Sequence, residues 1–146
     1  MKIAIGNDHA AVELKKWIME EFLDVDFINV GTDKDESVDY TDYSYEVCKK
    51  VNAGEAELGI LICGTGTGMA ISANKVKGIR AAMCYNEMMA EYAKRHNNAN
   101  VLAIGARVMG DELAKRVVRI FLNTPFDGGR HERRVNKITK IEEENL

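Results

Sequence analysis

The chain has 146 residues, 46% of them hydrophobic, and a formal net charge of −3 at pH 7. This length predicts a single domain, residues 1–146, with enough apolar side chains to bury a core. The charge provides no general basic surface, which argues against nucleic acid and anionic membranes as partners.

Five short apolar runs alternate with amphipathic segments. The runs are predicted as strands and cover residues 3–6, 25–31, 58–63, 79–84 and 101–105. Two sets of apolar residues recur at helical spacing. Ala11, Leu14, Ile18 and Phe22 lie between the first two runs, and Leu113, Val117 and Phe121 follow the last run. Apolar strands separated by single helices predict a parallel sheet covered on both faces. The expected fold is a doubly wound, Rossmann-like α/β/α domain of three layers, with a C-terminal helical tail.

Polar residues follow three of these strands. Asp8 and His9 come after the first, and Cys63 stands at the end of the third. Arg107 follows the fifth. Ligands bind open α/β sheets at the carboxyl ends of the strands, so we expect these side chains to share one edge. His96 ends the fourth helix, and we expect it near the same edge, where an imidazole could pass protons.

The third strand runs directly into a glycine-rich loop, Cys63-Gly64-Thr65-Gly66-Thr67-Gly68. Alternate glycines let the backbone approach a ligand closely, and amide groups at the start of a helix attract negative charge. That environment favours a thiolate at Cys63, suited to attack on a phosphate or to removal of a proton beside a carbonyl. The alternative is a helix-start turn with Cys63 packed as a small hydrophobic residue.

Known glycine motifs do not fit this loop. The dinucleotide fingerprint would need a glycine at Met69 or Ile71, and a P-loop would need a lysine before Lys75. A cysteine phosphatase would be expected to close the loop with an arginine, yet Met69 and Ala70 stand there. Proton abstraction is therefore favoured.

The segment 128–137 is basic within an acidic protein, with four positive side chains and one negative. Arg130 and Arg134 are four residues apart, so on a helix they would share one face and could hold one phosphate. Taken alone, this cluster, like His96 at a helix end or Asp8 as a helix cap, has an ordinary structural explanation.

Taken together, these motifs resemble the ribose-5-phosphate isomerase B family, which includes the galactose-6-phosphate isomerase subunits. The match runs nearly from end to end. It comprises Asn7-Asp8-His9, Ser37-Val38-Asp39-Tyr40, Ile62 to Gly68, Ala73-Asn74-Lys75, His96 to Asn100, and Gly128 to Arg134. The resemblance implies an enzyme of carbohydrate metabolism in the pentose phosphate pathway. It would be a homodimer, or a tetramer built from dimers, that interconverts aldose and ketose phosphates without metal or organic cofactor, at a site shared between subunits.

The resemblance also implies roles for individual residues. Cys63 would be the base that moves a proton between C1 and C2 through a cis-enediolate, and His96 would open the sugar ring. Thr65 would join them as a catalytic residue. The substrate-binding residues would be Asp8, His9, Tyr40, Gly64, Thr65, Gly66, Thr67, Gly68, Asn97, Arg107, Arg130 and Arg134. Gly64 to Gly68 would form the anion hole, and the arginines would hold the phosphate, some from the partner subunit.

Two positions depart from the family's pattern. Thr41 follows Tyr40 where a proline is common, which puts the sugar-binding role of Tyr40 in question. Asn7 stands where serine or cysteine is common. Two alternatives stay open: an isomerase of a six-carbon sugar such as galactose 6-phosphate or allose 6-phosphate, and a non-catalytic phosphate-binding module.

The chain opens on a strand-like segment, with no basic leader before a long apolar run. Its three cysteines, Cys48, Cys63 and Cys84, form no C-x-x-C pair, so neither a disulfide framework nor a zinc site is indicated. We therefore expect reduced thiols and a cytoplasmic protein.

Overall fold

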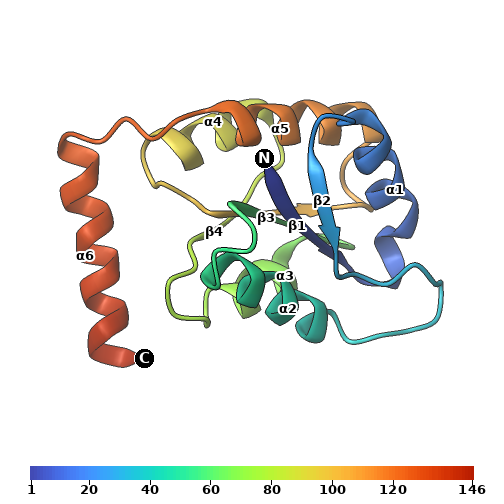
Figure 1. Cartoon of the computed structure of the whole chain (residues 1–146), viewed down its shortest axis with the longest axis horizontal. Helices are drawn as coiled ribbons and strands as arrows, with labels where there is room; N and C mark the ends of the chain where they lie inside the picture. The colour runs from blue at the N-terminus through green and yellow to red at the C-terminus, as the bar shows by residue number, and fades with distance from the viewer.

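A parallel sheet of five strands forms the centre of the computed structural model, which describes residues 1–146 (Figure 1). Its strand order is β2-β1-β3-β5-β4. The strands are β1 (Lys2–Asn7), β2 (Asp26–Asn29), β3 (Leu58–Cys63), β4 (Ala81–Met83) and β5 (Val101–Gly105). All four pairings are parallel, which confirms the predicted sheet.

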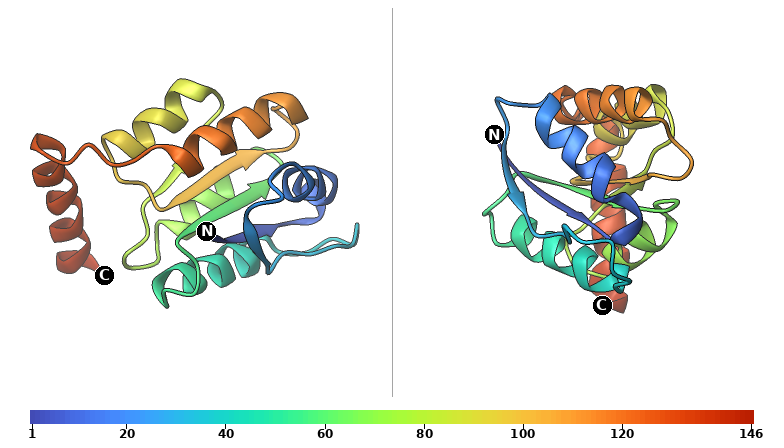
Figure 2. Two further views of the ribbon diagram at one scale, coloured as in Figure 1. Left: turned by 45° about the horizontal axis from the view of Figure 1, so that its top comes forward. Right: turned by 90° about the vertical axis from the view of Figure 1, so that its right-hand side faces the viewer.

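Helices cover both faces of the sheet, as predicted (Figures 1 and 2). One face carries α2 (Tyr40–Asn52) and α3 (Thr67–Ala73). The other carries α1 (Val12–Glu21), α4 (Glu87–Arg95) and α5 (Asp111–Asn123). A short 3₁₀ turn, η1 (His9–Ala11), precedes α1, and the last helix is α6 (Arg130–Asn145). None of the helices combines the length and apolar composition needed to cross a lipid bilayer.

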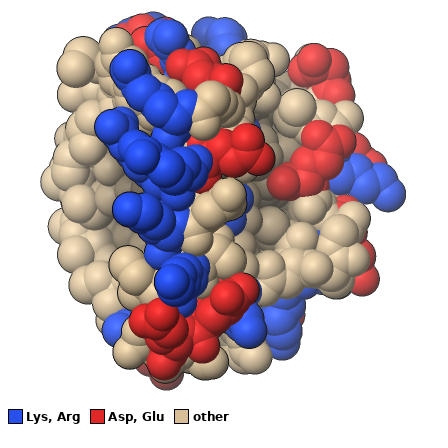
Figure 3. Space-filling model, turned by 90° about the vertical axis from the view of Figure 1, so that its left-hand side faces the viewer, with Lys and Arg blue, Asp and Glu red and all other residues tan.

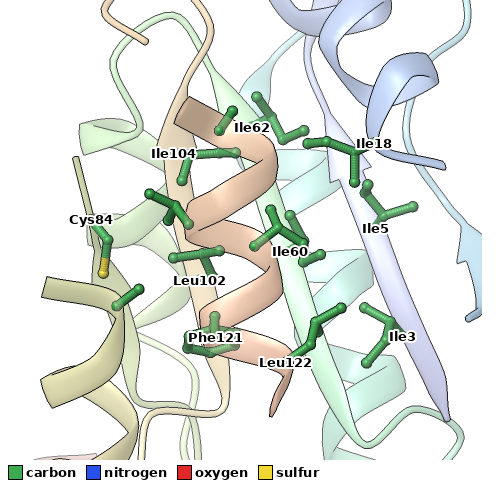
Figure 4. Close-up of a cluster of buried hydrophobic side chains, with 14 of the residues drawn as sticks. Ile3, Ile5, Ile18, Ile60, Ile62, Cys84, Leu102, Ile104, Phe121 and Leu122 are labelled. Carbon is green, nitrogen blue, oxygen red and sulfur yellow. The ribbon is translucent and has the colours of Figure 1, made fainter. Parts of the chain in front are cut away.

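Alternate residues of the central strands supply two separate cores. On β1, Ile3 and Ile5 pack with α1 and α5, whereas Ala4 faces α2 and α3. Figure 4 shows the first core, where isoleucines of the strands meet Phe121 and Leu122 of α5. Burial of each such side chain contributes about 1.5–3 kcal/mol relative to exposure. Cys63 belongs to the second core, which places its sulfur on the side of α2 and α3.

The two edge strands are shorter than predicted. β2 pairs only from Asp26 to Asn29, although the apolar run covers 25–31. β4 begins at Ala81 because Ile79 is held in a turn by its N–H bond to the Val76 carbonyl. An edge strand pairs on one side only, so each ladder extends only as far as its single partner allows.

The helix α6 stands apart from the rest of the molecule (Figures 1 and 2). The chain reaches it through residues 124–129, where Gly128 and Gly129 adopt positive φ angles of 69° and 54°. Far along the helix, Glu142 accepts a hydrogen bond of 2.7 Å from the Gly78 N–H. Apolar side chains of α6, including Ile138 and Ile141, are left exposed.

Candidate active site

Cys63 is the last residue of β3, with only 6% of its surface exposed. The loop folds back so that the Gly66 N–H donates to Cys63 Sγ at 3.2 Å. Gly66 has a φ of 87°, in the left-handed region that favours glycine, and it caps α3. The first amide groups of α3 have no partner within the helix and carry its positive end. Sulfur therefore lies where negative charge is stabilised.

The loop is held against the end of β5. The Ala106 N–H donates to the Cys63 carbonyl at 2.8 Å, and the Arg107 N–H donates to the Gly64 carbonyl at 2.9 Å. A Cβ atom on Gly64 would lie 3.3 Å from the Arg107 side chain, so this guanidinium lies beside the loop. A Cβ atom on Gly105 would lie 2.6 Å from the Thr65 backbone, which shows how closely the two segments approach.

Asp8 and His9 flank the same loop from β1. Asp8 is mostly buried, its N–H bonds to the Ile62 carbonyl, and its Oδ1 accepts from the Ala10 N–H, which is the helix-capping role considered above. His9 Nδ1 accepts a hydrogen bond of 3.2 Å from the Val38 N–H. In the neutral imidazole this assigns the proton to Nε2, which is then free to donate to a ligand.

The loop that supplies the Val38 N–H is fixed by a buried lysine. Lys15 of α1 is 1% exposed, and its Nζ donates to the Thr32 carbonyl at 2.7 Å. The ammonium group also bonds Asp33, and this contact holds the pKa of the Asp33 carboxyl below its usual value. The chain between β2 and α2 is thereby tied to the body of the domain.

Tyr40 begins α2, and its ring lies against Gly68 at the start of α3. A Cβ atom on Gly68 would be only 2.7 Å from the ring atoms Cε2 and Cζ. Thr41 lies in the first turn of α2, where proline is also tolerated, so this departure from the family's pattern leaves the backbone at Tyr40 helical.

The carboxyl edge of the sheet thus collects most of the candidate residues. They are Asp8, His9, Tyr40, Cys63, Gly64, Thr65, Gly66, Thr67, Gly68 and Arg107. The arrangement offers a thiol as base, a set of amide donors, a neutral imidazole and one guanidinium.

His96 and Asn97 lie elsewhere, contrary to our expectation. The helix α4 follows the carboxyl end of β4 and ends before the amino end of β5 at Val101, so His96 lies at the amino edge of the sheet. A strand of five residues separates the two edges, roughly 15 Å at the usual rise per residue. Within one chain, His96 is therefore not in the group around Cys63.

At the amino edge, His96 belongs to a second polar group built with α6. The imidazoles of His96 and His131 are stacked with centroids 4.0 Å apart. Asp127 Oδ2 lies 4.0 Å from His96 Nε2 and also accepts from Arg95 Nε at 3.2 Å. A cleft of about 230 Å³ is lined by His96, Asn97, His131, Arg134, Val135 and Ile138.

The two imidazoles and the carboxylate of this group are residue types that bind metal ions. Ligand atoms of His96, Asp127 and His131 lie within 4.8 Å of one another. However, the imidazole planes are inclined by only 8° and stacked, so their nitrogen lone pairs point along separate parallel planes. A metal ion needs both lone pairs to converge on it, and this set does not fit one.

Three residues near these groups were not found from the sequence. The Tyr85 hydroxyl donates to the Thr65 carbonyl at 2.8 Å and supports the loop. Asp127 and His131 meet His96 only because residues 124–129 bring the start of α6 to the end of α4. Their separation from His96 in the chain gives no local spacing signal, whereas the position of Tyr85 just after β4 was readable by the same edge rule as Arg107.

Comparison with known proteins gives a consistent result. Residues 3–138 match the model of a family described as ribose/galactose isomerase. Ribose-5-phosphate isomerase B of Escherichia coli is 46% identical over 97% of each chain. D-erythrulose-4-phosphate isomerase of Pectobacterium atrosepticum is 42% identical over 94% of this chain and 93% of its own. The structure of Clostridium thermocellum ribose-5-phosphate isomerase B has a TM-score of 0.97 and 47% identity, covering 100% of both chains.

Proposed function

Because the chain belongs to the ribose/galactose isomerase family, we propose that it is an aldose–ketose isomerase that interconverts ribose 5-phosphate and ribulose 5-phosphate. The observation that carries this proposal is the hydrogen bond from the Gly66 N–H to Cys63 Sγ, inside a loop of amide donors. It combines a base with a site for the negative charge that the base generates on the substrate.

The reaction moves one proton between neighbouring carbons. The Cys63 thiolate takes the proton from C2 of the open aldehyde, and the electrons of that bond form the C1–C2 double bond of a cis-enediolate. A proton returned from Cys63 to C1, with transfer of the proton of the C2 oxygen to the C1 oxygen, gives the ketone and regenerates the thiolate. The substrate is oxidised at C2 and reduced at C1 in equal measure, so the exchange requires no external electron acceptor.

Formation of the enediolate is the step that requires most stabilisation, because a sugar C–H bond is a weak acid. Amide groups of the loop from Gly64 to Gly68 are proposed to bind its oxygens, with His9 Nε2 as a further donor and Thr65 beside the reacting carbons. Loss of one such donor typically lowers kcat about 10²–10³-fold. Asp8 and Tyr40 lie where they could bind sugar hydroxyls.

Opening of the cyclic sugar requires a further acid and base, because Cys63 and His9 at the carboxyl edge are already assigned to the isomerisation step. We assign this step to His96, with Asn97 beside it. Since His96 and Cys63 lie at opposite edges of one chain, a complete site requires two chains, with His96, Asn97, Arg130 and Arg134 of one subunit facing Cys63 of the other. Arg107 and the two arginines of α6 would then hold the phosphate.

The exposed apolar side chains of α6 support a dimer. The helix projects from the body, and a cleft of about 460 Å³ separates its apolar side from the segment around Ile79. Ile138, Ile141 and Leu146 line this cleft and are 45%, 62% and 57% exposed. A second copy of the chain would cover these side chains and, by two-fold symmetry, place α6 over the partner's carboxyl edge.

Charge on the same side of the molecule suits an anionic substrate. Figure 3 shows Lys and Arg side chains gathered in a band across the side on which α6 stands. The helix itself carries Arg130, Arg133, Arg134, Lys137 and Lys140. In an acidic protein, this local positive potential would draw a sugar phosphate towards the proposed site.

The proposal is tested by following isomerisation of ribose 5-phosphate by the purified protein. Allose 6-phosphate, galactose 6-phosphate and erythrose 4-phosphate should be assayed in parallel, the last because one relative is named as an isomerase of a four-carbon sugar phosphate. We expect the highest kcat/KM with ribose 5-phosphate. Higher kcat/KM with a six-carbon substrate would reassign the substrate, and no turnover of any would remove the proposed function.

We place this activity in the cytoplasm, where phosphorylated sugars of the pentose phosphate pathway are retained. The three unpaired cysteines, Cys48, Cys63 and Cys84, suit a reducing compartment. A thiolate base in particular has to remain reduced to act.

A further inference from the structure

His131, at the start of α6, contacts the imidazole assigned to ring opening. Its ring is stacked on that of His96, with centroids 4.0 Å apart and an interplanar angle of 8°. Tyr92, one turn earlier on α4, places a second ring 4.7 Å from His96. His131 is 9% exposed, so its ring is covered in this contact, whereas the His96 side chain stays 36% exposed.

The backbone fixes this contact from both sides. The Asp127 N–H donates to the Arg95 carbonyl at 3.0 Å, which ties the segment before α6 to the last turn of α4. The Asp127 carboxylate accepts from Arg95 Nε, and its Oδ2 lies 4.0 Å from His96 Nε2. The His131 N–H bonds the Gly128 carbonyl, which anchors the first turn of α6.

Burial and nearby positive charge favour the neutral form of His131. Burial lowers the pKa of His131 below its usual 6.5, and the positive charges of His96, Arg130 and Arg134 lower it further, while Asp127 opposes them. Arg95 also lies at this junction, where it is paired with Asp127 and Glu91. The lowered pKa keeps His131 neutral at neutral pH.

We propose that His131 is a positioning residue for ring opening: its neutral imidazole, stacked on His96, holds the His96 ring in the orientation needed for proton transfer. This inference rests on the proposed function. Proton transfer requires a group within hydrogen-bond reach of the sugar oxygen, and a misplacement of about 1 Å can lower the rate about 10²-fold. His131 itself would touch no reacting atom.

The test compares His131→Ala, which removes the stack, with His131→Phe, which keeps a flat ring that cannot be protonated. Asn136→Ala, at an exposed position of the same helix, serves as the control for α6. At pH 8 we expect His131→Ala to lower kcat on ribose 5-phosphate about tenfold or more, with KM changed less than about twofold. His131→Phe should restore most of that kcat. Equal kcat for His131→Ala and the control, or for the two His131 variants, would overturn the proposal.

A pH profile separates positioning from simple packing. As the pH falls below 6.5, protonation of wild-type His131 places a further positive charge beside Arg130 and Arg134 and should disrupt the stack. The Phe ring has no such transition. The ratio of kcat for His131→Phe to kcat for wild type should therefore rise as the pH falls. Other pH dependences of kcat that the two proteins share cancel in this ratio. A ratio independent of pH would contradict the neutral state assigned to His131.

The coupling can also be measured without turnover. NMR titration of the imidazole resonances in His96→Gln should show a higher pKa for His131 than in the wild-type protein, because one positive neighbour is lost. An unchanged His131 pKa would overturn the inference even in an active isomerase. If the protein fails to isomerise any sugar phosphate, the proposed function fails, while this titration still reports whether the two rings are coupled.

Discussion

At the scale of single residues, the three cysteines differ in ways that composition could not reveal. Burial raises the pKa of Cys48 and of Cys84 to about 11, and neither thiol is more than 1% exposed. Cys63 instead receives the Gly66 N–H at its sulfur and faces the glycine loop. The same residue type therefore serves as core packing twice and as a candidate base once.

Replacement of Cys63 tests its assignment as the base. Cys63→Ala should lower turnover of ribose 5-phosphate by at least about 10²-fold, the usual contribution of a general base. Binding of the sugar phosphate, measured by calorimetry, should persist because the loop and Arg107 remain. Cys84→Ala provides a control that removes a buried thiol of the other core. Wild-type turnover in Cys63→Ala would show that another group moves the proton.

Alkylation distinguishes the thiols directly. With a pKa of about 11, only roughly a thousandth of Cys48 or Cys84 is ionised at pH 8, and the thiolate is the reactive form. Iodoacetamide followed by mass spectrometry should therefore label Cys63 first, and ribose 5-phosphate should slow that labelling. Labelling of Cys48 or Cys84 as fast as Cys63 in the folded protein would contradict this account.

The role of His96 can be separated from the isomerisation step by a substrate that does not cyclise. The 4-hydroxyl of erythrose 4-phosphate carries the phosphate, so no five-membered ring can close. His96→Gln should lower kcat/KM for ribose 5-phosphate about 10²-fold or more and should affect erythrose 4-phosphate much less. An equal loss on both substrates would place His96 in another step.

At the scale of elements, the turn between β3 and α3 decides the geometry of the site. Gly66 and Gly54 both have positive φ angles, 87° and 74°, where an L side chain is strained. Around Gly54 the space is open, but a Cβ atom on Gly66 would lie 3.0 Å from the Ile104 backbone. Backbone of a buried strand cannot move aside as a flexible side chain can.

These two glycines form a matched pair for a stability measurement. Gly54→Ala should lower the free energy of unfolding by about 1 kcal/mol, the typical cost of the left-handed conformation. Gly66→Ala should lower it by clearly more in urea unfolding, and turnover should fall only in this variant. Equal losses of stability would show that crowding against Ile104 does not constrain the loop.

The elements were largely predictable because each carries a local pattern. The buried strands β3 and β5 have the predicted bounds, since every residue in them is apolar or glycine up to Cys63 and Gly105. The lengths of the edge strands were overestimated, because an apolar run such as 25–31 does not reveal where pairing with its only neighbouring strand ends. The glycine-rich loop after β3 was readable from the sequence, whereas the close approach of Tyr40 to Gly68 depends on packing between two helices.

At the scale of the whole molecule, the two polar groups lie at opposite edges of the sheet. This could have been derived from the topology, because a helix between parallel strands runs back to their amino ends and carries His96 there. The meeting of His96 with His131 could not, since it depends on the path of residues 124–129 to α6. With Cys63 and His96 so placed, the proposed mechanism requires each chain to contribute half of two sites.

The central claim, a site shared by two subunits, is tested most directly by mixing two damaged chains. Cys63→Ala and Arg134→Ala are each expected to be nearly inactive as pure dimers. Unfolded and refolded together in equal amounts, random pairing gives about half heterodimers, each with one intact site and one doubly damaged site. Roughly a quarter of wild-type activity should return. If mass spectrometry confirms heterodimers and activity stays at the level of the separate variants, Arg134 serves its own subunit's Cys63 and the shared site is contradicted.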